Sequence, residues 1–285
     1  MTPSKTCLIT GANAGIGRAA ARQLVAAGHH VLIGCRDRAK GEAVAAELSG
    51  AGRATVLELD LASQRSIRAA AARVEVLDVL IHNAAYFDVR APGRVETPEG
   101  VELTWATNHL GPALLTELLL PRLLAREDAR VVAVTSKGLV MHPRLVVDLE
   151  DPEFRRRRFT VPRAYYHSKL AHLAWMLQLA ERHRGTALLA LGVRVTNVKV
   201  DLARYPGLAW PLRLAYALKS RFSISPDEMA KTYVWLATAP RDTLPTGSYW
   251  DAVDRPASVS RWAAEPEHRV ALEALTRAQL GLEAR

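Results

Sequence analysis

The chain has 285 residues, of which 49% are hydrophobic and 24% are charged, the composition of a globular protein with a large core. Its net charge of +9 could favour binding to a nucleic acid, a membrane surface or an anionic cofactor. Because the basic residues are mostly dispersed and no aromatic stacking platform accompanies them, we expect no nucleic-acid partner.

Hydrophobic segments alternate with amphipathic helical segments along the chain. We expect strands at 6–10, 29–35, 53–60, 77–84, 129–136 and 191–200, with a short last strand at 247–251. We expect helices at 18–28, 40–50, 63–74, roughly 100–125, from Tyr165 to about 184, at 225–238 and in a C-terminal tail at about 261–285. This order predicts a Rossmann-type α/β fold, a doubly wound parallel sheet in a three-layer α/β/α arrangement.

No linker or internal repeat divides the chain, so we expect residues 1–285 to form a single domain. The most hydrophobic stretch, 111–125, is interrupted by Glu117 and Pro121, which argues against a membrane span. Cys7 and Cys35 lie in hydrophobic runs without the spacing of a zinc site or a disulfide framework. With no cationic leader before the first strand, these features predict a cytoplasmic protein.

The first strand is followed by a glycine-rich turn, TGANAGIGR at residues 10–18. Such a turn lets the backbone approach a pyrophosphate, and the next helix supplies N–H donors and its positive dipole end. The spacing is GxxxGxG rather than GxGxxG, so an ordinary turn is the alternative. The predicted cofactor-binding residues of this turn are Gly11, Asn13, Ala14, Gly15, Ile16 and Gly17.

The second strand ends in Cys35, which Arg36 follows. Sites that prefer NAD usually place an acid here for the ribose 2′-hydroxyl, whereas a guanidinium suits a 2′-phosphate. Arg36 therefore favours NADP(H), with NADPH preferred over NADH. Asp37 could turn inward instead, and Arg38 could help the phosphate or face water.

The third and fourth strands also end in polar residues. Asp60 could accept a hydrogen bond from the adenine amino group, or it could be an acid in the first turn of the next helix. Asn83 could hydrogen-bond across neighbouring strand ends and shape the cofactor cleft. Leu61 and Ala84 follow these two residues and complete the predicted cofactor-binding set.

Several phrases occur in the order typical of the short-chain dehydrogenase/reductase family, which the chain resembles: TGANAGIG, LDL, HNAA, NHLG, VVAVTS and YYHSK. GANAGIGR, CRDRAKGE, NHLGPALLT and YYHSKLA are similar to phrases of retinol-dehydrogenase-like members. The resemblance runs from about residue 5 to about 185 and continues more loosely to the end.

The resemblance implies a Ser–Tyr–Lys–Asn site that moves a hydride between NAD(P) and a carbonyl or alcohol. The family's YxxxK spacing selects Tyr165 and Lys169, and the matching serine and asparagine are Ser136 and Asn108. Ser136 would orient the substrate oxygen, or it could simply cap the turn after its strand. Asn108 would open its helix and reach Lys169 through water, or it could be a satisfied buried asparagine.

Tyrosine and lysine four residues apart share one face of a helix. A free phenol has a pKa near 10, and bringing it to neutral pH would take roughly 4 kcal/mol. An ammonium about 5 Å away, at an effective dielectric of about 20, offers about 3 kcal/mol. We therefore expect Tyr165 to carry the proton and Lys169 to lower its pKa, with Tyr166 as a packing or wall residue.

One place departs from the family's usual pattern. Val200 and Asp201 stand where the family usually has Pro-Gly, which puts the nicotinamide contacts in question. A substrate loop is expected at about 201–223, with Tyr205, Trp210, Tyr216 and Phe222. The four arginines at 155–158 could line the entrance to the substrate site or form a solvated face.

The nine histidines show no metal-ligand spacing, so no metal site is predicted. His167 and His172 are expected to pack against neighbouring side chains.

The sequence thus predicts an NADP(H)-dependent oxidoreductase acting on a small carbonyl or alcohol substrate, apolar or aromatic in character, with a homodimer or homotetramer as the candidate assembly. The alternatives are a reductase of conjugated double bonds on the same scaffold and a catalytically silent NADP(H)-binding sensor or partner protein.

Overall fold

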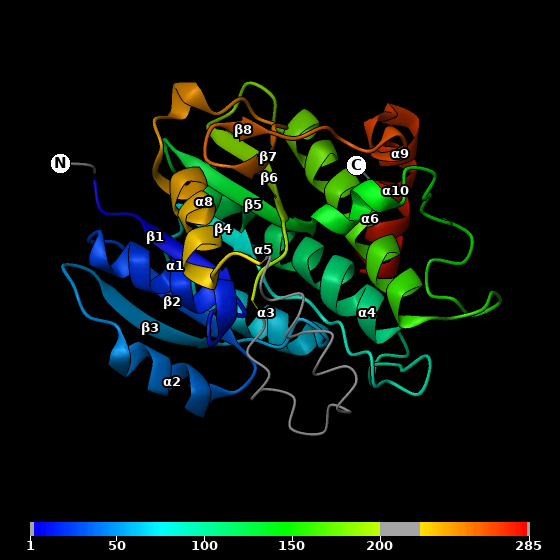
Figure 1. Ribbon diagram of the computed structural model, residues 1–285, viewed down its shortest axis with the longest axis horizontal. Helices are drawn as coiled ribbons and strands as arrows, with labels where there is room; N and C mark the ends of the chain where they lie inside the picture. The colour runs from blue at the N-terminus through cyan, green and yellow to red at the C-terminus, as the bar shows by residue number, and fades with distance from the viewer. Residues whose placement is uncertain (1–2, 200–222, 284–285) are drawn as a thin grey trace.

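The computed structural model describes residues 3–199 and 223–283. Its centre is an eight-stranded sheet in the order β3-β2-β1-β4-β5-β6-β7-β8 (Figure 1). All neighbouring strands run parallel except β7 and β8, which pair antiparallel. The strands are β1 (Thr6–Thr10), β2 (His30–Cys35), β3 (Arg53–Glu58), β4 (Val79–His82), β5 (Ala129–Ser136), β6 (Leu188–Val195), β7 (Tyr249–Ala252) and β8 (Arg255–Pro256).

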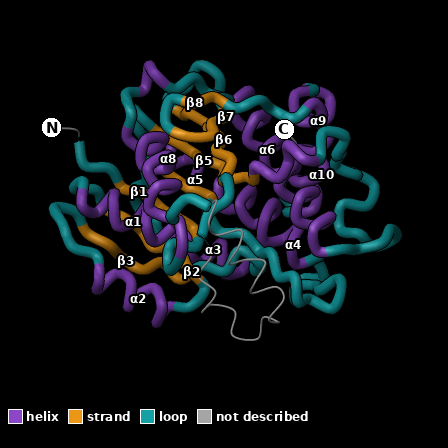
Figure 2. Tube along the Cα trace, viewed as in Figure 1, coloured by secondary structure: helices purple, strands orange, loops and turns teal. Residues whose placement is uncertain are grey.

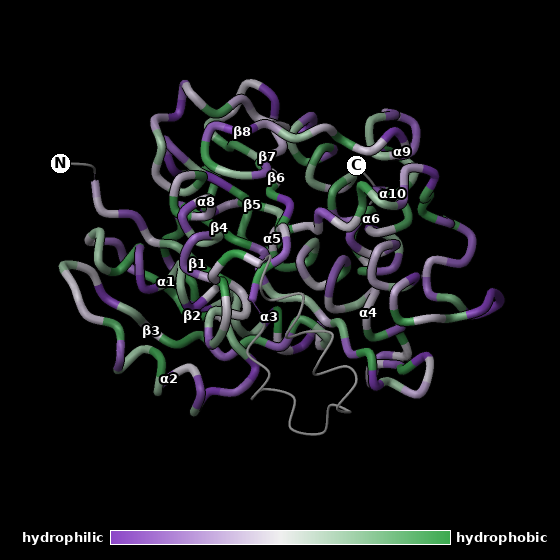
Figure 3. Tube along the Cα trace, viewed as in Figure 1, coloured by the Kyte–Doolittle hydropathy of each residue, from purple (hydrophilic) through white to green (hydrophobic). Residues whose placement is uncertain are grey.

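Helices cover both faces of this sheet, and Figure 2 shows the strands enclosed between them. One hydrophobic cluster joins the sheet to α1 (Gly15–Ala26), α2 (Arg38–Glu47) and α8 (Pro226–Thr238). A second cluster joins the opposite face to α3 (Gln64–Ala72), α5 (Gly111–Leu124) and α6 (Val161–Arg182), with α9 (Arg261–Ala264) and α10 (Pro266–Gln279) packed outside. Figure 3 shows hydrophobic residues along the central strands. The predicted doubly wound, three-layer α/β fold is confirmed.

The sequence located β1 and β5 at their observed bounds, and two of the expected helices, at 63–74 and 225–238, start at serines that act as caps. Ser63 accepts a hydrogen bond from Ser66 N, and Ser225 accepts one from Glu228 N. Helix α6 begins at Val161, four residues before the expected start, because Thr160 caps it and proline occupies its first turn.

One expected strand has different bounds, one strand was missed, and one expected helix is divided. Strand β6 covers Leu188–Val195 rather than 191–200, since Leu188 pairs with Ala129 and the pairing ends opposite Ser136. Strand β8 is only two residues long and carries no pattern that alternation could reveal. The helix expected at about 100–125 is divided into α4 (Leu103–Trp105), a π-helical turn η1 (Ala106–Leu110) and α5.

The order of the strands reverses beside β1, whose two neighbours are β2 and β4. Crevices at such a reversal, outside the carboxyl ends of the strands, are where ligands bind in sheets of this type. Gly11 has a left-handed backbone at φ +68°, and its N–H donates to Gly34 O over 2.7 Å. A Cβ added at Gly17 would lie 2.5 Å from Asn83 Nδ2 and 2.8 Å from Gly11 O. Glycine is therefore required where α1 crosses the ends of β1 and β4.

We expect Gly17→Ala to destabilise the fold by about 1–3 kcal/mol, because the methyl group has no space beside Gly11 and Asn83. The clash must outweigh the roughly 0.5–1 kcal/mol that alanine usually adds in a helix. Gly93→Ala is the matched control, since an added Cβ there meets nothing within 4 Å. Urea unfolding measures both, and a Gly17→Ala protein as stable as the control would contradict this account.

Candidate active site

The glycine-rich turn presents the start of α1 without a polar cap. Ala14 is the N-cap residue in an extended conformation, and its methyl side chain offers the first N–H groups no hydrogen bond. Gly15 has φ +56°, so a left-handed residue opens the helix. Asn13 and Ile16 are half-buried, and Ile16 packs on the core cluster of α1. The free N–H donors and the positive end of the helix dipole suit an anionic group.

Asn83 ties the end of β4 to this turn. Its Nδ2 donates to Thr10 O over 2.8 Å, and Ala84 N donates to Thr10 Oγ1 over 3.0 Å. The hydrogen bond predicted across neighbouring strand ends is therefore present. Asn83 and Ala84 thus hold Thr10, the last residue of β1, and through it they position the start of the glycine-rich turn.

The sequence left open where the side chains of the three residues after β2 would point, and in the structure each makes different contacts. Asp37 caps α2 by accepting from Lys40 N over 3.1 Å, and it forms an ion pair with Lys40. Arg38 pairs with Glu42 within the same helix. Arg36 is exposed, and within the described residues no hydrogen bond or ion pair fixes its guanidinium. Asp37 is thus directed to the helix, and Arg36 is the cation at the strand end that can meet a ligand.

After β3, Asp60 accepts a hydrogen bond from Ala62 N over 2.9 Å, and its own N–H donates to Ser66 Oγ over 2.9 Å. These contacts place Asp60 in the turn before the Ser63 cap of α3, and not in the first turn of that helix where the alternative put it. Leu61 is buried, and its carbonyl oxygen lies close to Gly111. A Cβ added at Gly111 would lie only 2.2 Å from that oxygen.

Ser136 and Tyr165 meet at the end of β5. Ser136 Oγ accepts from Gly138 N over 3.1 Å, so the predicted capping role is present. Ser136 also lies close enough to the Tyr165 side chain to affect its pKa. Burial raises the pKa of Tyr165 to about 12, the neighbouring Tyr166 adds to this, and Ser136 opposes it. The phenol is therefore protonated at neutral pH.

Lys169 lies one turn further along α6 and is only 2% exposed. Its Nζ donates to Val134 O over 2.8 Å and lies 6.0 Å from the centre of the Tyr165 ring. Burial lowers the pKa of Lys169 to about 7. The expectation that this ammonium lowers the phenol pKa is not met in this structure, because burial raises that pKa and Lys169 is not among the groups that lower it.

Asn108 lies in the π-helical turn η1 and is 1% exposed. The predicted local opening of the helix is thus present. Its Oδ1 accepts from Tyr86 N over 2.7 Å, and its Nδ2 donates to Tyr86 O and to Ser168 Oγ, each over 3.1 Å. These contacts satisfy the buried amide directly, as the alternative interpretation proposed, and they reach the residue beside Lys169.

Tyr166 packs against the turn that follows β5. A Cβ at Gly138 would come within 2.5 Å of the Tyr166 ring, and His142 lies 4.5 Å from it between ring centres. The predicted packing role of this second tyrosine is confirmed. His167 and His172 are also buried among aromatic rings, as expected.

The arginines at 155–158 are held largely by nearby acids rather than forming a free cationic rim. The Asp151 carboxylate accepts from the backbone N–H groups of Arg155, Arg156 and Arg157. Arg155 also pairs with Glu153, and Arg157 approaches Asp148 to 3.3 Å.

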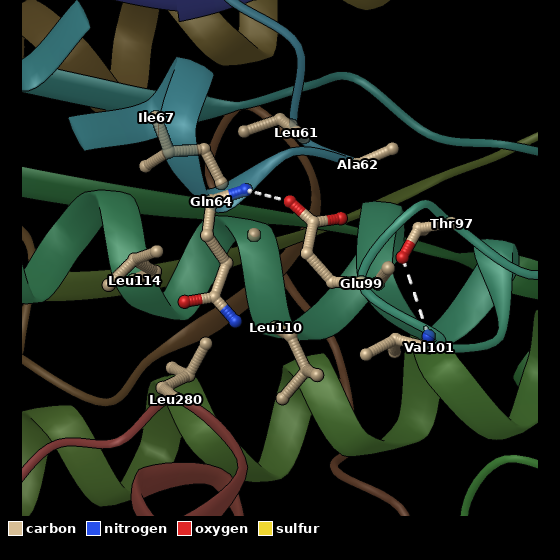
Figure 4. Close-up of a pocket in the computed structure, with 12 residues that line it drawn as sticks. Leu61, Ala62, Gln64, Ile67, Thr97, Glu99, Val101, Leu110, Leu114 and Leu280 are labelled. Carbon is tan, nitrogen blue, oxygen red and sulfur yellow. Dashed lines mark hydrogen bonds between the residues drawn. The ribbon is translucent and has the colours of Figure 1, made fainter. Parts of the chain in front are cut away.

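A small cavity of about 20 Å³ lies between α3, α5 and the end of α10 (Figure 4). Leu61, Ile67, Leu114 and Leu280 line it, and Gln64 N donates to Glu99 at its edge. A space of this size holds about one water molecule. It touches none of the four predicted catalytic residues, so it is not a substrate site.

Sequence reasoning missed Tyr86, Phe87 and Ser168. Tyr86 and Ser168 bind Asn108, and the ring of Phe87 lies 4.7 Å from that of Tyr165. Ser168 could have been suspected from its place beside Lys169, whereas the loop after β4 carries no periodicity. Val200, Asp201 and the aromatic residues of the expected substrate loop, Tyr205, Trp210, Tyr216 and Phe222, lie outside the described residues.

Residues 3–199 and 223–283 hold neither a metal-binding cluster nor a membrane-spanning helix. In this part of the chain, no cluster of histidine, cysteine, aspartate and glutamate could hold a metal ion. No helix there combines the length and hydropathy that crossing a bilayer requires.

Comparisons with known proteins agree on one family. A family profile described as short chain dehydrogenase matches residues 5–146. Human retinol dehydrogenase 14 is 35% identical over 267 residues, which cover 86% of this chain and 77% of that protein. The crystal structure of an uncharacterised protein from Mycobacterium paratuberculosis is 32% identical with a TM-score of 0.76, and the match covers 99% of this chain and 96% of that one.

A structure from Beutenbergia cavernae, described as an NAD(P)-dependent gluconate 5-dehydrogenase with NADP bound at low occupancy, is 25% identical with a TM-score of 0.65. That match covers 92% of this chain and 97% of the other. Given a relative as similar as retinol dehydrogenase 14 over most of both chains, this chain belongs to the short-chain dehydrogenase/reductase family of NAD(P)-dependent oxidoreductases.

Proposed function

We propose that this protein uses NADP(H) to interconvert a carbonyl compound and its alcohol, with Tyr165 as the general acid and base. The observation that carries the proposal is the place of Tyr165 beside Ser136, close enough for Ser136 to lower the phenol pKa, with Lys169 one helical turn away. The cofactor supplies or accepts the hydride. Ser136 orients the substrate oxygen, and Tyr165 transfers the proton to or from it.

The protonation state of Tyr165 bears on direction. A neutral phenol, with its pKa raised to about 12 by burial, is the form that donates a proton to a reduced carbonyl. Alcohol oxidation needs the phenolate instead, and the positive charge of an oxidised nicotinamide ring would favour it. Lys169 would add to that effect when protonated, and would also hold the nicotinamide ribose.

Two observations support NADP(H) over NAD(H). Asp37 is engaged by α2, which leaves the exposed Arg36 to meet a 2′-phosphate. The related Beutenbergia cavernae protein was crystallised with NADP. For the substrate, the names of the retinol dehydrogenase relatives and the rings of Phe87 and Tyr166 beside Tyr165 support an apolar or aromatic compound.

A cytoplasmic location, a homodimer or homotetramer, and one domain with a substrate loop at 201–223 stay predictions. A panel of ketones, aldehydes and conjugated enones, assayed by loss of NADPH absorbance, tests the function itself. Turnover of carbonyls supports the proposal, and turnover of enones alone favours a double-bond reductase. Cofactor binding without any turnover would favour the silent sensor.

We expect Tyr165→Phe to lower kcat by about 10²- to 10⁴-fold, the usual contribution of a general acid, while NADPH affinity stays within about twofold. Tyr166→Phe is the control and should lose far less activity, because its ring packs on Gly138. Steady-state kinetics and NADPH fluorescence titration measure both variants. Normal turnover by Tyr165→Phe together with an inactive Tyr166→Phe would show that the wrong tyrosine has been assigned.

We expect Arg36→Ala to weaken NADPH binding about 10- to 100-fold, the value of a charge-assisted hydrogen bond, and NADH binding much less. Arg38→Ala is the matched control, since Arg38 already pairs with Glu42. Equal weakening of the two cofactors by Arg36→Ala would count against a phosphate contact.

The buried lysine gives stability a pH dependence of known sign. Burial lowers the pKa of Lys169 from 10.5 to about 7, so the folded state disfavours the ammonium. This destabilisation is complete below about pH 7 and disappears as the pH rises toward 10.5, where the unfolded lysine also loses its proton. Relative to wild type, Lys169→Met should therefore gain roughly 2–4 kcal/mol of unfolding free energy at about pH 6 compared with about pH 10.

Denaturant unfolding of the cofactor-free protein at the two pH values measures this difference. Lys137→Met is the control. It removes an exposed lysine that directly follows β5, the strand to which Lys169 donates its hydrogen bond, and it should show no such dependence. An equal effect of Lys169→Met on the unfolding free energy at both pH values would mean that burial does not lower the pKa of Lys169.

A further inference from the structure

Tyr165 lies between two aromatic rings. The ring centre of Phe87 is 4.7 Å away at an interplanar angle of 58°, and that of Tyr166 is 5.3 Å away at 71°. Phe87 belongs to the loop after β4 and keeps 38% of its surface exposed, whereas Tyr166 packs on Gly138 and His142. Phe87 is thus the ring that contacts the predicted proton donor and also remains open to a ligand.

The loop that carries Phe87 is fixed by its neighbour, Tyr86. Both backbone polar groups of Tyr86 bind the Asn108 amide, N–H to Oδ1 over 2.7 Å and C=O from Nδ2 over 3.1 Å. A buried amide that holds both groups of one residue sets the position and the orientation of that peptide segment. Phe87 follows directly, so its backbone can shift little while this pair of hydrogen bonds is intact.

The same amide is fixed from the side of α6. Ser168 Oγ donates its single hydrogen to Tyr165 O over 2.8 Å, so it must accept the second amide hydrogen of Asn108. Hydrogen bonds therefore run without a break from the Tyr86 backbone through Asn108 and Ser168 to the Tyr165 backbone. One end of this series carries the Tyr165 ring, and the other end, Tyr86, directly precedes Phe87, whose ring contacts that of Tyr165.

The π-helical turn that presents Asn108 is anchored on its other flank by His109. Thr276 Oγ1 donates to Leu272 O over 2.7 Å, so the 2.8 Å contact between His109 Nε2 and Thr276 Oγ1 places the proton on Nε2. Turns of this kind are rare and often occur at functional sites. Here the turn is held between α6 and α10 with the Asn108 amide directed at the Phe87 loop.

We propose that Phe87 is a specificity-determining residue, a wall that selects carbonyl substrates with a planar aromatic group, and that Asn108 and Ser168 position it against Tyr165. The inference rests on the proposed function and deepens it by naming the side chain that contacts the substrate and selects it. Aromatic rings attract one another beyond simple burial, so the wall favours a ring over an alkyl chain of similar size.

The test compares benzaldehyde with propanal in wild type, Phe87→Ala and Phe87→Tyr. We expect the ratio of kcat/KM for benzaldehyde to that for propanal to fall about tenfold in Phe87→Ala, mainly through KM. Phe87→Tyr keeps a ring and should restore the ratio to within about twofold. Val89→Ala is the matched control, a 44% exposed residue on the same loop, and should leave the ratio unchanged.

Ser168→Ala tests the positioning role in a double-mutant cycle with Phe87→Ala. Because Ser168 acts on the wall only through Asn108, its effect on the substrate ratio should disappear once Phe87 is absent. Effects of the two changes that multiply independently would overturn the positioning role.

The outcomes separate this inference from the proposed function. If the wild type reduces neither aldehyde nor any carbonyl in the wider panel, the proposed function fails. If the wild type is active and Phe87→Ala keeps the wild-type ratio within about twofold, well short of the tenfold expected of a lost aromatic contact, the function stands and the wall is refuted.

Discussion

The hydrogen bond from the Lys169 ammonium to the Val134 carbonyl fixes how α6 lies on β5, and the site depends on that register. Four helical residues advance about 6 Å. Two strand residues advance about 6.6 Å. With Lys169 docked on Val134, Tyr165 therefore arrives at Ser136, two residues further along the strand. The YxxxK spacing is thus a geometric match between one helical turn and two residues of a strand.

This docking buries Lys169 and leaves Tyr165 half-buried, and the loss of water around both groups then controls their charge. Each pKa is displaced toward the neutral form, that of Lys169 down to about 7 and that of Tyr165 up to about 12. The cofactor-free protein thus holds a neutral phenol beside an amine that readily loses its proton. A bound cofactor would change this balance, because its nicotinamide ring is positive when oxidised and its phosphates are negative.

Patterns local to one segment made most of the fold predictable. The ends of β1 and β5 and the capping serines followed from hydrophobic runs and helix-start signals. The π-helical turn could not be read from periodicity, since Asn108 is fitted there by contacts to Tyr86 and Ser168 from distant segments. The raised phenol pKa was missed for a related reason: a sequence gives the spacing of two charges but not how deeply both are buried.

Titration of the Tyr165 phenol with and without oxidised NADP tests the central claim most directly. The near-ultraviolet phenolate signal of the wild type, less that of Tyr165→Phe, reports this one group among the protein's seven tyrosines. The account predicts a pKa near 12 in the cofactor-free protein and a clearly lower one in the complex, because the positive ring and Lys169 then favour the phenolate. A pKa that stays the same when the cofactor binds would contradict a proton-transfer role for Tyr165.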